Sequence, residues 1–309
     1  MHKKVLIFGI GGFVGPYLAN EFHTHGYEVY GTDLIESKSI PEYVRFTMCD
    51  LLSDESVDCL IKDVKPDYII NLAAVSNVGL SWKIPQKTIA VNVEGSINIL
   101  EAIRKHTPEA RILLIGSSEE YEPSDEPIDE HAKLNANNPY GISKIMQEQF
   151  AKLYSERYGL KIYHVRAFNH TGVGQSDTFV IPSWCKQAAE ISKSGKPGVM
   201  KVGNLDVWRD FSDVRDVVRA YRMVIESEYT DNVFNVGSGV AYSLKDILDQ
   251  ITSLSSENII VEINPDLYRP ADNAYIACSC QFIKSMLHWS PEISLSRTLK
   301  DVYTSFSMN

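Results

Sequence analysis

The sequence has no excess of positive charge, which limits the partners expected for it. Its 309 residues contain 30 Lys and Arg against 40 Asp and Glu, giving a formal net charge of -10. Nucleic acids and anionic membranes bind basic patches, so we expect this chain to bind neither. A nucleotide ligand is compatible with the charge, because a few arginines and backbone amides can hold phosphate inside an acidic protein.

Long apolar runs and a cysteine framework are also missing. No stretch approaches the ~18 apolar residues that span a membrane, and the apolar run near the start ends at Gly9, too early for a signal peptide. The five cysteines are scattered, and Cys278 and Cys280 lack the second knuckle or the nearby histidines of a zinc site. We expect a soluble, cytoplasmic protein without a metal.

What the sequence does contain is an alternation of short apolar runs and amphipathic stretches. The runs are rich in β-branched and aromatic residues and cover 4–9, 28–33, 45–50, 68–74, 111–116 and 161–168. The stretches expected to be helical cover 13–25, 54–64, 85–106 and 139–158. This pattern is typical of α/β proteins with a parallel sheet covered on both faces. We predict a doubly wound parallel sheet, the Rossmann fold, with ligands at the carboxyl ends of its strands.

The pattern changes after Phe168, where a Gly-rich polar loop is followed by short segments interrupted by Gly and Pro. We predict that residues 1–168 form a dinucleotide-binding domain and that 213–239 return to it. Residues 169–212 and 240–309 are expected to form a smaller C-terminal α/β lobe that binds the substrate.

The first predicted strand runs into a turn with Gly9, Gly12 and Gly15 at every third position. Glycine permits a tight turn, a close approach of backbone to a pyrophosphate and tight packing of helix on sheet. The following helix directs the N–H groups of its first turn at the phosphates. We predict a dinucleotide site here, which includes Phe13 and Val14.

The second predicted strand ends in Asp33, at about the twenty-residue spacing of a carboxylate that accepts hydrogen bonds from the adenosine ribose. A carboxylate repels the 2′-phosphate of NADP, and no arginine follows it. We therefore predict NAD, with NADP as the alternative. Asp50 suits a contact to adenine and suits equally well a cap of the helix that starts near Ser53.

The strongest chemical signal is the pair Tyr140 and Lys144, with Pro139 well placed to begin a helix. Residues four apart share one face of a helix. A phenol exchanges protons at neutral pH only when a nearby cation stabilises its phenolate. Lys144 supplies that cation one turn away and can also hold the nicotinamide ribose. We expect this pair to be catalytic.

Together with the glycine turn and the strand that ends in Ser117, this pair resembles the extended short-chain dehydrogenases/reductases that act on nucleotide sugars, over essentially the whole chain. The resemblance implies that Ser117 hydrogen-bonds the sugar, that Tyr140 exchanges its proton and that Lys144 supports both. It also implies further cofactor contacts, at Leu51, Leu72, Ala73, Ala74 and Asn92. From the residues alone, Asn92 is also compatible with an ordinary polar position on a helix.

Several motifs are similar to those of the GDP-mannose branch of this family: RAFNHTG at 166–172, GNLD at 203–206, RDF at 209–211 and RPAD at 269–272. The resemblance implies a GDP-sugar substrate whose diphosphate, ribose and guanosine contact a set of residues: Asn169, Val180, Lys186, Lys201, Val202, Asn204, Arg209, Arg269 and Asp272. Guanidinium groups suit phosphate because they offer several fixed donors. Without the resemblance, Arg209 beside Asp210 is typical of a surface ion pair.

Two reactions of this branch fit the motifs. Ser118 and Glu119 match the hydroxyl and glutamate with which family dehydratases remove water from GDP-mannose. The opening glycine turn, the FNHTGVGQ loop, the DFSDVRDVVRAY segment and the length resemble the reductases instead. We expect reduction of the 4-keto group of GDP-4-dehydro-6-deoxy-D-mannose to GDP-6-deoxy-D-mannose. The alternatives are GDP-mannose 4,6-dehydratase, another nucleotide-sugar epimerase or dehydratase, and a NAD-sensing regulatory protein.

Of the remaining residues of the SSEEY run, Tyr121 is expected to be structural. Glu120 is expected to lie on the opposite side of an extended chain from Glu119 and not to be catalytic. The resemblance also implies a homodimer formed by the helices at 85–106 and 139–158. The apolar positions compatible with that interface, or equally with packing on the sheet, are Ile97, Leu100, Ile103, Phe150 and Leu153.

Overall fold

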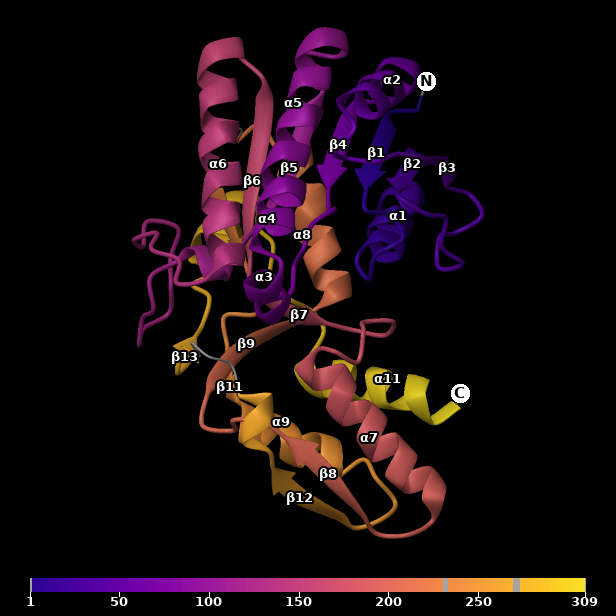
Figure 1. Cartoon of the computed structure of the whole chain (residues 1–309), viewed down its shortest axis with the longest axis vertical. Coiled ribbons are helices and arrows are strands. Elements are labelled where there is room, and N and C mark those ends of the chain that lie inside the picture. The colour runs from indigo at the N-terminus through magenta and orange to yellow at the C-terminus, as the bar shows by residue number, and fades with distance from the viewer. Residues whose placement is uncertain (1, 230–232, 269–272, 309) are drawn as a thin grey trace.

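The computed structural model describes residues 2–229, 233–268 and 273–308. A seven-stranded parallel sheet runs through it in the order β10-β6-β5-β4-β1-β2-β3 (Figure 1). From β1 the chain moves outward through β2 to β3. It then crosses to β4 on the other side of β1 and moves outward through β5 and β6 to β10. The predicted doubly wound fold is therefore confirmed. The strands are β1 (Lys4–Phe8), β2 (Glu28–Asp33), β3 (Arg45–Met48), β4 (Tyr68–Asn71), β5 (Arg111–Ser117), β6 (Lys161–Ala167) and β10 (Val233–Val236).

Helices cover both faces of the sheet because its strands send apolar side chains alternately to either side. Val5 and Ile7 of β1 pack into one core, whereas Leu6 and Phe8 pack into the other. The helices on the first face are α1 (Gly15–Thr24), α8 (Val214–Glu226) and α10 (Gln281–Leu287). Those on the second face are α2 (Asp54–Val64), α5 (Gly95–His106) and α6 (Pro139–Tyr158).

The helix predicted over 85–106 is present but interrupted. It consists of α4 (Pro85–Ile89), a π-helical turn η1 (Ala90–Glu94) and α5, and it is preceded by the short helix α3 (Val78–Lys83). A π turn inserts an extra residue into the helical hydrogen-bond ladder and is frequent at functional sites. This turn carries Asn92.

A smaller lobe with a core of its own follows β6, and buried Trp184, Met200, Ile247 and Leu299 pack within it. It contains one sheet of β7 (Asn169–Thr171), β9 (Trp208–Asp213), β11 (Ala241–Ser243) and β13 (Tyr275–Ile276), and another of β8 (Gly198–Val202) and β12 (Ile259–Ile263). Its helices are α7 (Val180–Ser194), α9 (Leu244–Thr252), η3 (Pro265–Leu267) and α11 (Leu295–Met308).

The return of the chain to the large sheet is more extensive than expected. Besides α8 and β10, the helix α10 and the fully buried Trp289 pack into the core of the large sheet. Ile283 and Trp289, from the 240–309 range, therefore belong to the hydrophobic core of the large sheet.

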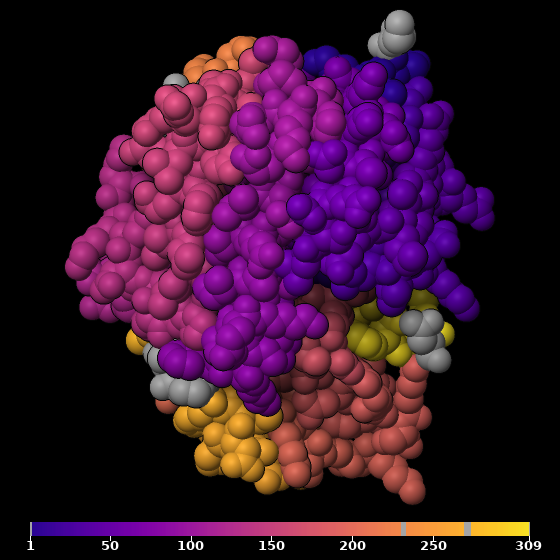
Figure 2. Space-filling view, turned by 45° about the horizontal axis from the view of Figure 1, so that its top comes forward, coloured from indigo at the N-terminus to yellow at the C-terminus, as the bar shows by residue number. Residues whose placement is uncertain are grey.

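The two parts meet where the strands of the large sheet end. In Figure 1 the arrows of β1 and β4 point toward the smaller lobe. Figure 2 shows the surface recessed where the purple N-terminal half overhangs the salmon and yellow residues of that lobe. Ligands of doubly wound sheets bind at this end of the strands. No helix among the described residues is long and apolar enough to span a bilayer.

Candidate active site

The glycine turn between β1 and α1 lies against the end of β4. Gly9 has a φ of +78°, and a Cβ there would lie 2.7 Å from the Ala73 nitrogen. A Cβ at Gly15 would collide with the Ile10 carbonyl, so only glycine lets α1 begin this close to the turn. Within the described residues no side chain caps α1 at Val14. The Gly15 N–H, however, donates to the Gly12 carbonyl at 3.2 Å and Pro16 has no N–H, so α1 would act on an anionic ligand chiefly through its helix dipole.

The glycine turn is held by a hydrogen bond within it and by a ring contact with His170 of β7. The Gly12 N–H donates to the Gly9 carbonyl at 3.1 Å. The Phe13 ring stacks on His170 with the ring centroids 6.2 Å apart, and burial lowers the pKa of His170. A neutral imidazole suits this apolar contact, which joins the turn to β7.

Asp33, the last residue of β2, reaches back over the glycine turn. Its Oδ2 accepts a hydrogen bond from the Gly11 N–H at 3.1 Å, and its Oδ1 accepts one from the Leu34 N–H at 2.8 Å. The register of β1 against β2 brings the two strand ends together. The carboxylate therefore lies beside the turn, at the place where an adenosine ribose would bind.

The second candidate acidic residue, Asp50, does not cap α2. Ser53 does so, because its Oγ accepts a hydrogen bond from the Ser56 N–H at 3.2 Å. Asp50 is exposed and accepts from the Leu52 N–H at 2.9 Å, whereas Leu51 is buried. The capping alternative is thus wrong, and contact with adenine stays a prediction.

Asn92 links the end of β4 to the helix that carries the tyrosine and lysine. It is fully buried, its Oδ1 accepts from the Val75 N–H at 2.8 Å, and its Nδ2 donates to the Ser143 Oγ at 2.8 Å. An ordinary solvent-facing helix position has no such contacts. Leu72, Ala73 and Ala74 lead from β4 into the segment that Asn92 holds, and the Leu72 N–H bonds back to β1.

Tyr140 and Lys144 occupy the first turns of α6. Asn138 caps this helix, its Oδ1 accepting from the Gly141 N–H at 2.9 Å. A Cβ at Gly141 would collide with the Glu119 carbonyl, so glycine lets the helix lie directly against the residues after β5. The Lys144 Nζ donates to the Ile115 carbonyl at 2.6 Å and lies 5.9 Å from the centroid of the Tyr140 ring.

Burial sets the charge states of this pair. It raises the pKa of Tyr140, hydrogen bonding from Ser117 lowers it, and the charges of Glu120 and Glu119 raise it further. The net pKa lies above the ordinary value, opposite to the direction we predicted, because desolvation of the phenolate outweighs the hydrogen bond from Ser117. Burial also lowers the pKa of Lys144 to about 8, although the charge of Glu120 raises it.

The residues after Ser117 form a turn rather than the extended chain we predicted. Ser118–Glu120 is a single 3-10 turn, η2. The Ser117 Oγ accepts from the Glu119 N–H at 3.2 Å, and the Glu120 Oε1 accepts from the Ser117 N–H at 2.6 Å. This reciprocal capping box closes the turn. Half-buried Glu119 contacts Asn138, the cap of α6, whereas Glu120 is fully buried close to Glu148 and His164.

The predicted substrate residues lie across the smaller lobe and at its border. Asn169 is in β7, Val180 begins α7, Lys186 lies in α7, Lys201 and Val202 in β8, Asn204 in the turn after it, and Arg209 in β9. Arg269 and Asp272 lie outside the described residues.

Arg209 is not the surface residue that the sequence alone suggests. Arg209 and Asp210 are both buried, the Arg209 Nη1 donates to the Trp208 carbonyl at 2.8 Å, and the Asn169 Nδ2 reaches the Asp210 carbonyl at 3.3 Å. Asp210 itself accepts from four donors on Ser238, Gly239 and Cys278. The segment is therefore rigid and places Arg209 near the border between the two parts.

Two other residues predicted to contact the substrate, Lys186 and Asn204, bond to residues of the smaller lobe itself. The Lys186 Nζ pairs with the Asp177 Oδ2 at 2.7 Å, and the Asn204 Oδ1 accepts from the Asp206 N–H at 3.0 Å. The Val202 side chain is fully buried in the lobe's core, whereas Lys201 is exposed.

Sequence reasoning missed two polar residues that hold the site together. The Gln147 Nε2 donates to the Ser96 Oγ at 2.6 Å, and its Oε1 accepts from the Lys144 Nζ at 3.3 Å. The Asn138 Nδ2 donates to the Glu119 Oε2 at 2.8 Å. Gln147 follows Lys144 by three residues, and Asn138 precedes Pro139, so helical spacing and capping preference were the available signals.

A glycine turn after β1, a carboxylate at the end of β2, and buried Ser117, Tyr140 and Lys144 on β5 and α6 together define a short-chain dehydrogenase/reductase. Comparison with known proteins narrows this class. The chain belongs to the GDP-mannose 4,6 dehydratase family, whose model matches residues 6–302.

Individual relatives agree with this placement. A GDP-6-deoxy-D-mannose reductase of Pseudomonas aeruginosa is 27% identical over 99% of this chain and 98% of its own length. A GDP-mannose 4,6-dehydratase of Vibrio cholerae is 27% identical over 96% of this chain and 91% of its own length. The structure of RMD from Pseudomonas aeruginosa complexed with NADPH has a TM-score of 0.84 at 25% identity, covering 100% of this chain and 98% of that one. The predicted family and enzyme class are confirmed.

Proposed function

We propose that this chain is a nucleotide-sugar reductase that converts GDP-4-dehydro-6-deoxy-D-mannose to GDP-6-deoxy-D-mannose. The observation that carries the proposal is the alignment with a GDP-6-deoxy-D-mannose reductase, which pairs 99% of this chain with 98% of that protein, whereas a related dehydratase is covered over 91% of its length. The site is compatible with it, because Tyr140 is a buried phenol whose pKa is raised by burial and which is protonated at neutral pH. Reduction of a ketone needs such a proton donor at the C4 oxygen.

The cofactor is a nicotinamide dinucleotide, and the residues around the glycine turn fit it. Gly9 and Gly15 leave no room for side chains, which allows a pyrophosphate to approach the backbone. Asp33 would hold the adenosine ribose and Lys144 the nicotinamide ribose. The carboxylate supports NAD over NADP, and the NADPH bound to the related RMD makes NADP the alternative. When bound, the cofactor supplies the hydride.

The protein's own residues would bind the ketone and deliver the proton. The Ser117 Oγ would hydrogen-bond the C4 oxygen and orient the carbonyl toward Tyr140. The Tyr140 phenol would give its proton to the C4 oxygen. With the hydride that the bound cofactor would supply to C4, the product would gain one hydride and one proton. The Lys144 ammonium stabilises the phenolate left behind. Asn169 and Arg209 would hold the diphosphate at the border of the smaller lobe.

The second candidate is the dehydratase, and the position of Glu119 favours it. Its carboxylate accepts from the Asn138 Nδ2 at 2.8 Å and acts electrostatically on Tyr140. A carboxylate beside the proton-exchanging tyrosine is what abstraction of the C5 proton requires. Ser118 follows Ser117 in the same turn and is buried, so both groups of the dehydratase pattern are present.

The two reactions are separated by what each consumes. We expect no reaction with GDP-mannose alone, and loss of NADH absorbance when the 4-keto sugar is supplied. A 4-keto product from GDP-mannose without net change in NADH would instead identify the dehydratase. Binding of the dinucleotide without turnover of either sugar would favour the regulatory alternative.

A further inference from the structure

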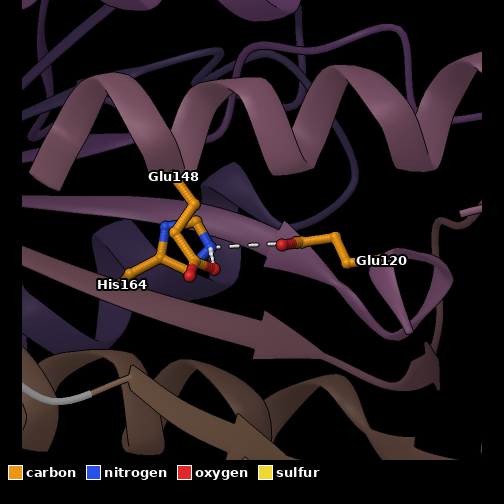
Figure 3. A group of neighbouring side chains, drawn as sticks. All are labelled: Glu120, Glu148 and His164. Atoms are coloured by element: carbon orange, nitrogen blue, oxygen red, sulfur yellow. Dashed lines mark ion pairs between the residues drawn. The ribbon is translucent and has the colours of Figure 1, made fainter. Parts of the chain in front are cut away.

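One group of described side chains is spaced closely enough to hold a metal ion: Glu120, Glu148 and His164. Figure 3 shows Glu148 on α6 over the ring of His164 on β6, with the Glu120 carboxylate approaching from the end of β5. The Arg166 guanidinium, however, lies 2.7 Å from the Glu148 Oε1 and 3.5 Å from the Glu120 Oε2. It already occupies the position of a cation against both carboxylates. These residues therefore form an ion network that links α6 to β6.

A separate cluster consists of two thiols in the segment that leads from β13 to α10. Cys278 lies in an extended stretch, bridged to Ile128, and side chains two residues apart along such a stretch point to the same side. The Sγ atoms of Cys278 and Cys280 lie 3.5 Å apart. Cys278 is 1% exposed, whereas Cys280 is half-buried. The pair therefore combines an enclosed thiol with a more accessible one.

Hydrogen bonds fix the backbone of Cys278 on both sides. Its N–H donates to the Asp210 Oδ2 at 3.1 Å, and the N–H of the next residue, Ser279, donates to the Ile128 carbonyl at 2.9 Å. A movement that brings the two sulfur atoms into bonding distance therefore falls mainly to Cys280, directly before α10.

Two glycines in the segment after β10 make room for the sulfur atoms. A Cβ at Gly237 would lie 2.5 Å from the Cys278 Cβ and 3.0 Å from its Sγ, so a larger residue would displace this thiol. Gly239 has a φ of +78°, and a Cβ there would lie 3.4 Å from the Cys280 Sγ. The Cys280 thiol donates to the Gly237 carbonyl at 3.2 Å, which holds it beside Cys278. The glycines thus allow the two thiols to lie in contact.

A cavity of about 410 Å³ adjoins the two thiols. Its lining includes Cys278, Cys280, Ser238, Gly239 and Trp289. A water molecule takes up about 30 Å³ of liquid, so a molecule of the size of hydrogen peroxide fits beside the thiols. Because Cys280 is the less buried of the two, a reagent in this cavity reaches its sulfur first.

The surroundings of the pair favour oxidation over metal binding. Structural zinc takes about four ligands, and in the part of the chain that the structure describes no third His, Cys, Asp or Glu is close enough to complete a metal site with these thiols. Burial raises the pKa of the Cys278 thiol well above its ordinary value. Cys278 therefore stays protonated at neutral pH, and the half-buried Cys280 is the thiol that reacts first with an oxidant.

We propose that Cys278 and Cys280 form a thiol oxidation site, at which hydrogen peroxide converts the pair to an intramolecular disulfide. The Cys280 sulfur attacks one oxygen of the peroxide, the O–O bond breaks, and Cys280 sulfenic acid and water form. The Cys278 sulfur then attacks the Cys280 sulfur. The S–S bond forms, the S–O bond breaks, and the oxygen leaves as a second water with the Cys278 proton. The thiols are thereby oxidised while the peroxide is reduced to water, and neither the sugar nor the nicotinamide cofactor takes part.

The test exposes the full-length wild type to hydrogen peroxide, at a concentration that oxidises the exposed Cys59 but leaves the circular dichroism of the chain unchanged. The reaction is stopped by denaturing the chain with N-ethylmaleimide, which alkylates every free thiol. Both cysteines of the pair lie in the tryptic peptide 246–284, whose mass reports their state. We expect this peptide to lose two hydrogen atoms and to carry no label, and to take up a label on each cysteine after treatment with dithiothreitol.

Dimedone, which traps sulfenic acids, identifies the thiol that reacts first. In the wild type Cys278 consumes the sulfenic acid of Cys280, so little is trapped there. In Cys278→Ser the sulfenic acid has no partner, and we expect at least about tenfold more dimedone at Cys280, because a thiol in contact outcompetes a reagent in solution. In Cys280→Ser the buried Cys278 stays reduced. The matched control is Cys59→Ser, which removes an exposed thiol outside the pair and leaves formation of the disulfide unchanged.

A 246–284 peptide that still carries a label on each cysteine while Cys59 is oxidised would overturn the proposal, and so would a disulfide that joins Cys280 to Cys59. Oxidation of Cys278 in Cys280→Ser to the same extent as in the wild type would contradict the order of the two steps. The wild-type measurement needs no variant, so it decides the proposal even if Cys278→Ser fails to fold. It also needs no substrate, and its result stands even if the wild type reduces no keto sugar.

Discussion

The Asn138 side-chain amide donates a hydrogen bond of 2.8 Å to the Glu119 carboxylate. The same residue caps α6 by accepting from the Gly141 N–H. One asparagine thus ties the candidate base of a dehydratase to the helix that carries Tyr140 and Lys144. Glu119 is held in place whether or not it takes part in the chemistry, so its presence alone does not choose the reaction.

Replacing Glu119 with Gln separates the two reactions. In a reductase the residue only lines the pocket, and we expect kcat for the 4-keto sugar to stay within about tenfold of the wild-type value. In a dehydratase the variant loses the C5 base, with a fall of about a hundredfold or more in formation of the 4-keto product. Steady-state rates with each sugar measure the difference, and a large loss of reductase turnover would contradict the passive role.

Tyr140→Phe removes the proton donor and leaves the cofactor site intact. We expect turnover to fall by about a hundredfold to ten-thousandfold, while dinucleotide affinity, followed by fluorescence titration, remains unchanged. Tyr121→Phe is the matched control, because that buried phenol donates to the Asn235 Oδ1 at 2.7 Å instead of facing the substrate. It should cost about 1–2 kcal/mol of stability and leave turnover intact; similar losses in both variants would argue against a catalytic Tyr140.

Asp33→Ser tests the choice of cofactor. The carboxylate beside the Gly11 N–H accepts from a ribose and repels a 2′-phosphate, so its loss should lower kcat/KM for NADH by about tenfold and raise it for NADPH. The ratio of the two kcat/KM values measures the effect. Glu36→Gln, an exposed neutralisation three residues along, should leave the ratio alone. A wild type that already prefers NADPH would contradict the assignment of Asp33.

Lys144→Met should abolish turnover and yet stabilise the fold at pH 7. Because burial lowers the pKa of Lys144 to about 8, the folded chain loses this proton near pH 8 and the unfolded chain near pH 10.5. Burying the ammonium therefore destabilises the fold below pH 8, and this cost disappears between pH 8 and 10.5.

Urea unfolding at several pH values measures the effect. The variant should gain up to about 3 kcal/mol at pH 7, offset in part by the lost hydrogen bond to Ile115, and the gain should vanish as the pH approaches 10.5. A variant that is less stable than the wild type at pH 7 and equally so at pH 10 would show that the burial cost is absent.

Local patterns predicted most of the fold and the centre of the site. The glycine turn, Asp33 and the Tyr140–Lys144 pair are set by strand ends and helical spacing, and each lies where the sequence indicates. The 3-10 turn after Ser117 was missed although Ser117 and Glu120 have the spacing of a capping box. What no short window of sequence contains is the burial of Glu120 against His164 and Arg166, more than forty residues along the chain.

The direction of the Tyr140 pKa was missed for a similar reason. The spacing of Tyr140 and Lys144 shows that a cation lies one helical turn from the phenol. The burial of the phenol, however, depends on how α6 packs against β5. The helices expected to form the dimer show the same dependence on packing. Leu100 and Ile103 are buried against the sheet, whereas Leu153 is exposed on α6, and the sequence pattern alone does not distinguish these positions. The homodimer, the domain boundaries and the cytoplasmic location stay predictions.

In the proposed reaction the hydride ends at C4 of the sugar and the Tyr140 proton at its oxygen. The most direct test supplies GDP-4-dehydro-6-deoxy-D-mannose with NADH deuterated at the transferred position and locates the label by mass spectrometry and NMR. We expect one deuterium at C4 of the product for each NADH consumed. Failure to reduce the keto sugar, together with conversion of GDP-[4-²H]mannose to a 4-keto sugar labelled at C6 without loss of NADH, would contradict it.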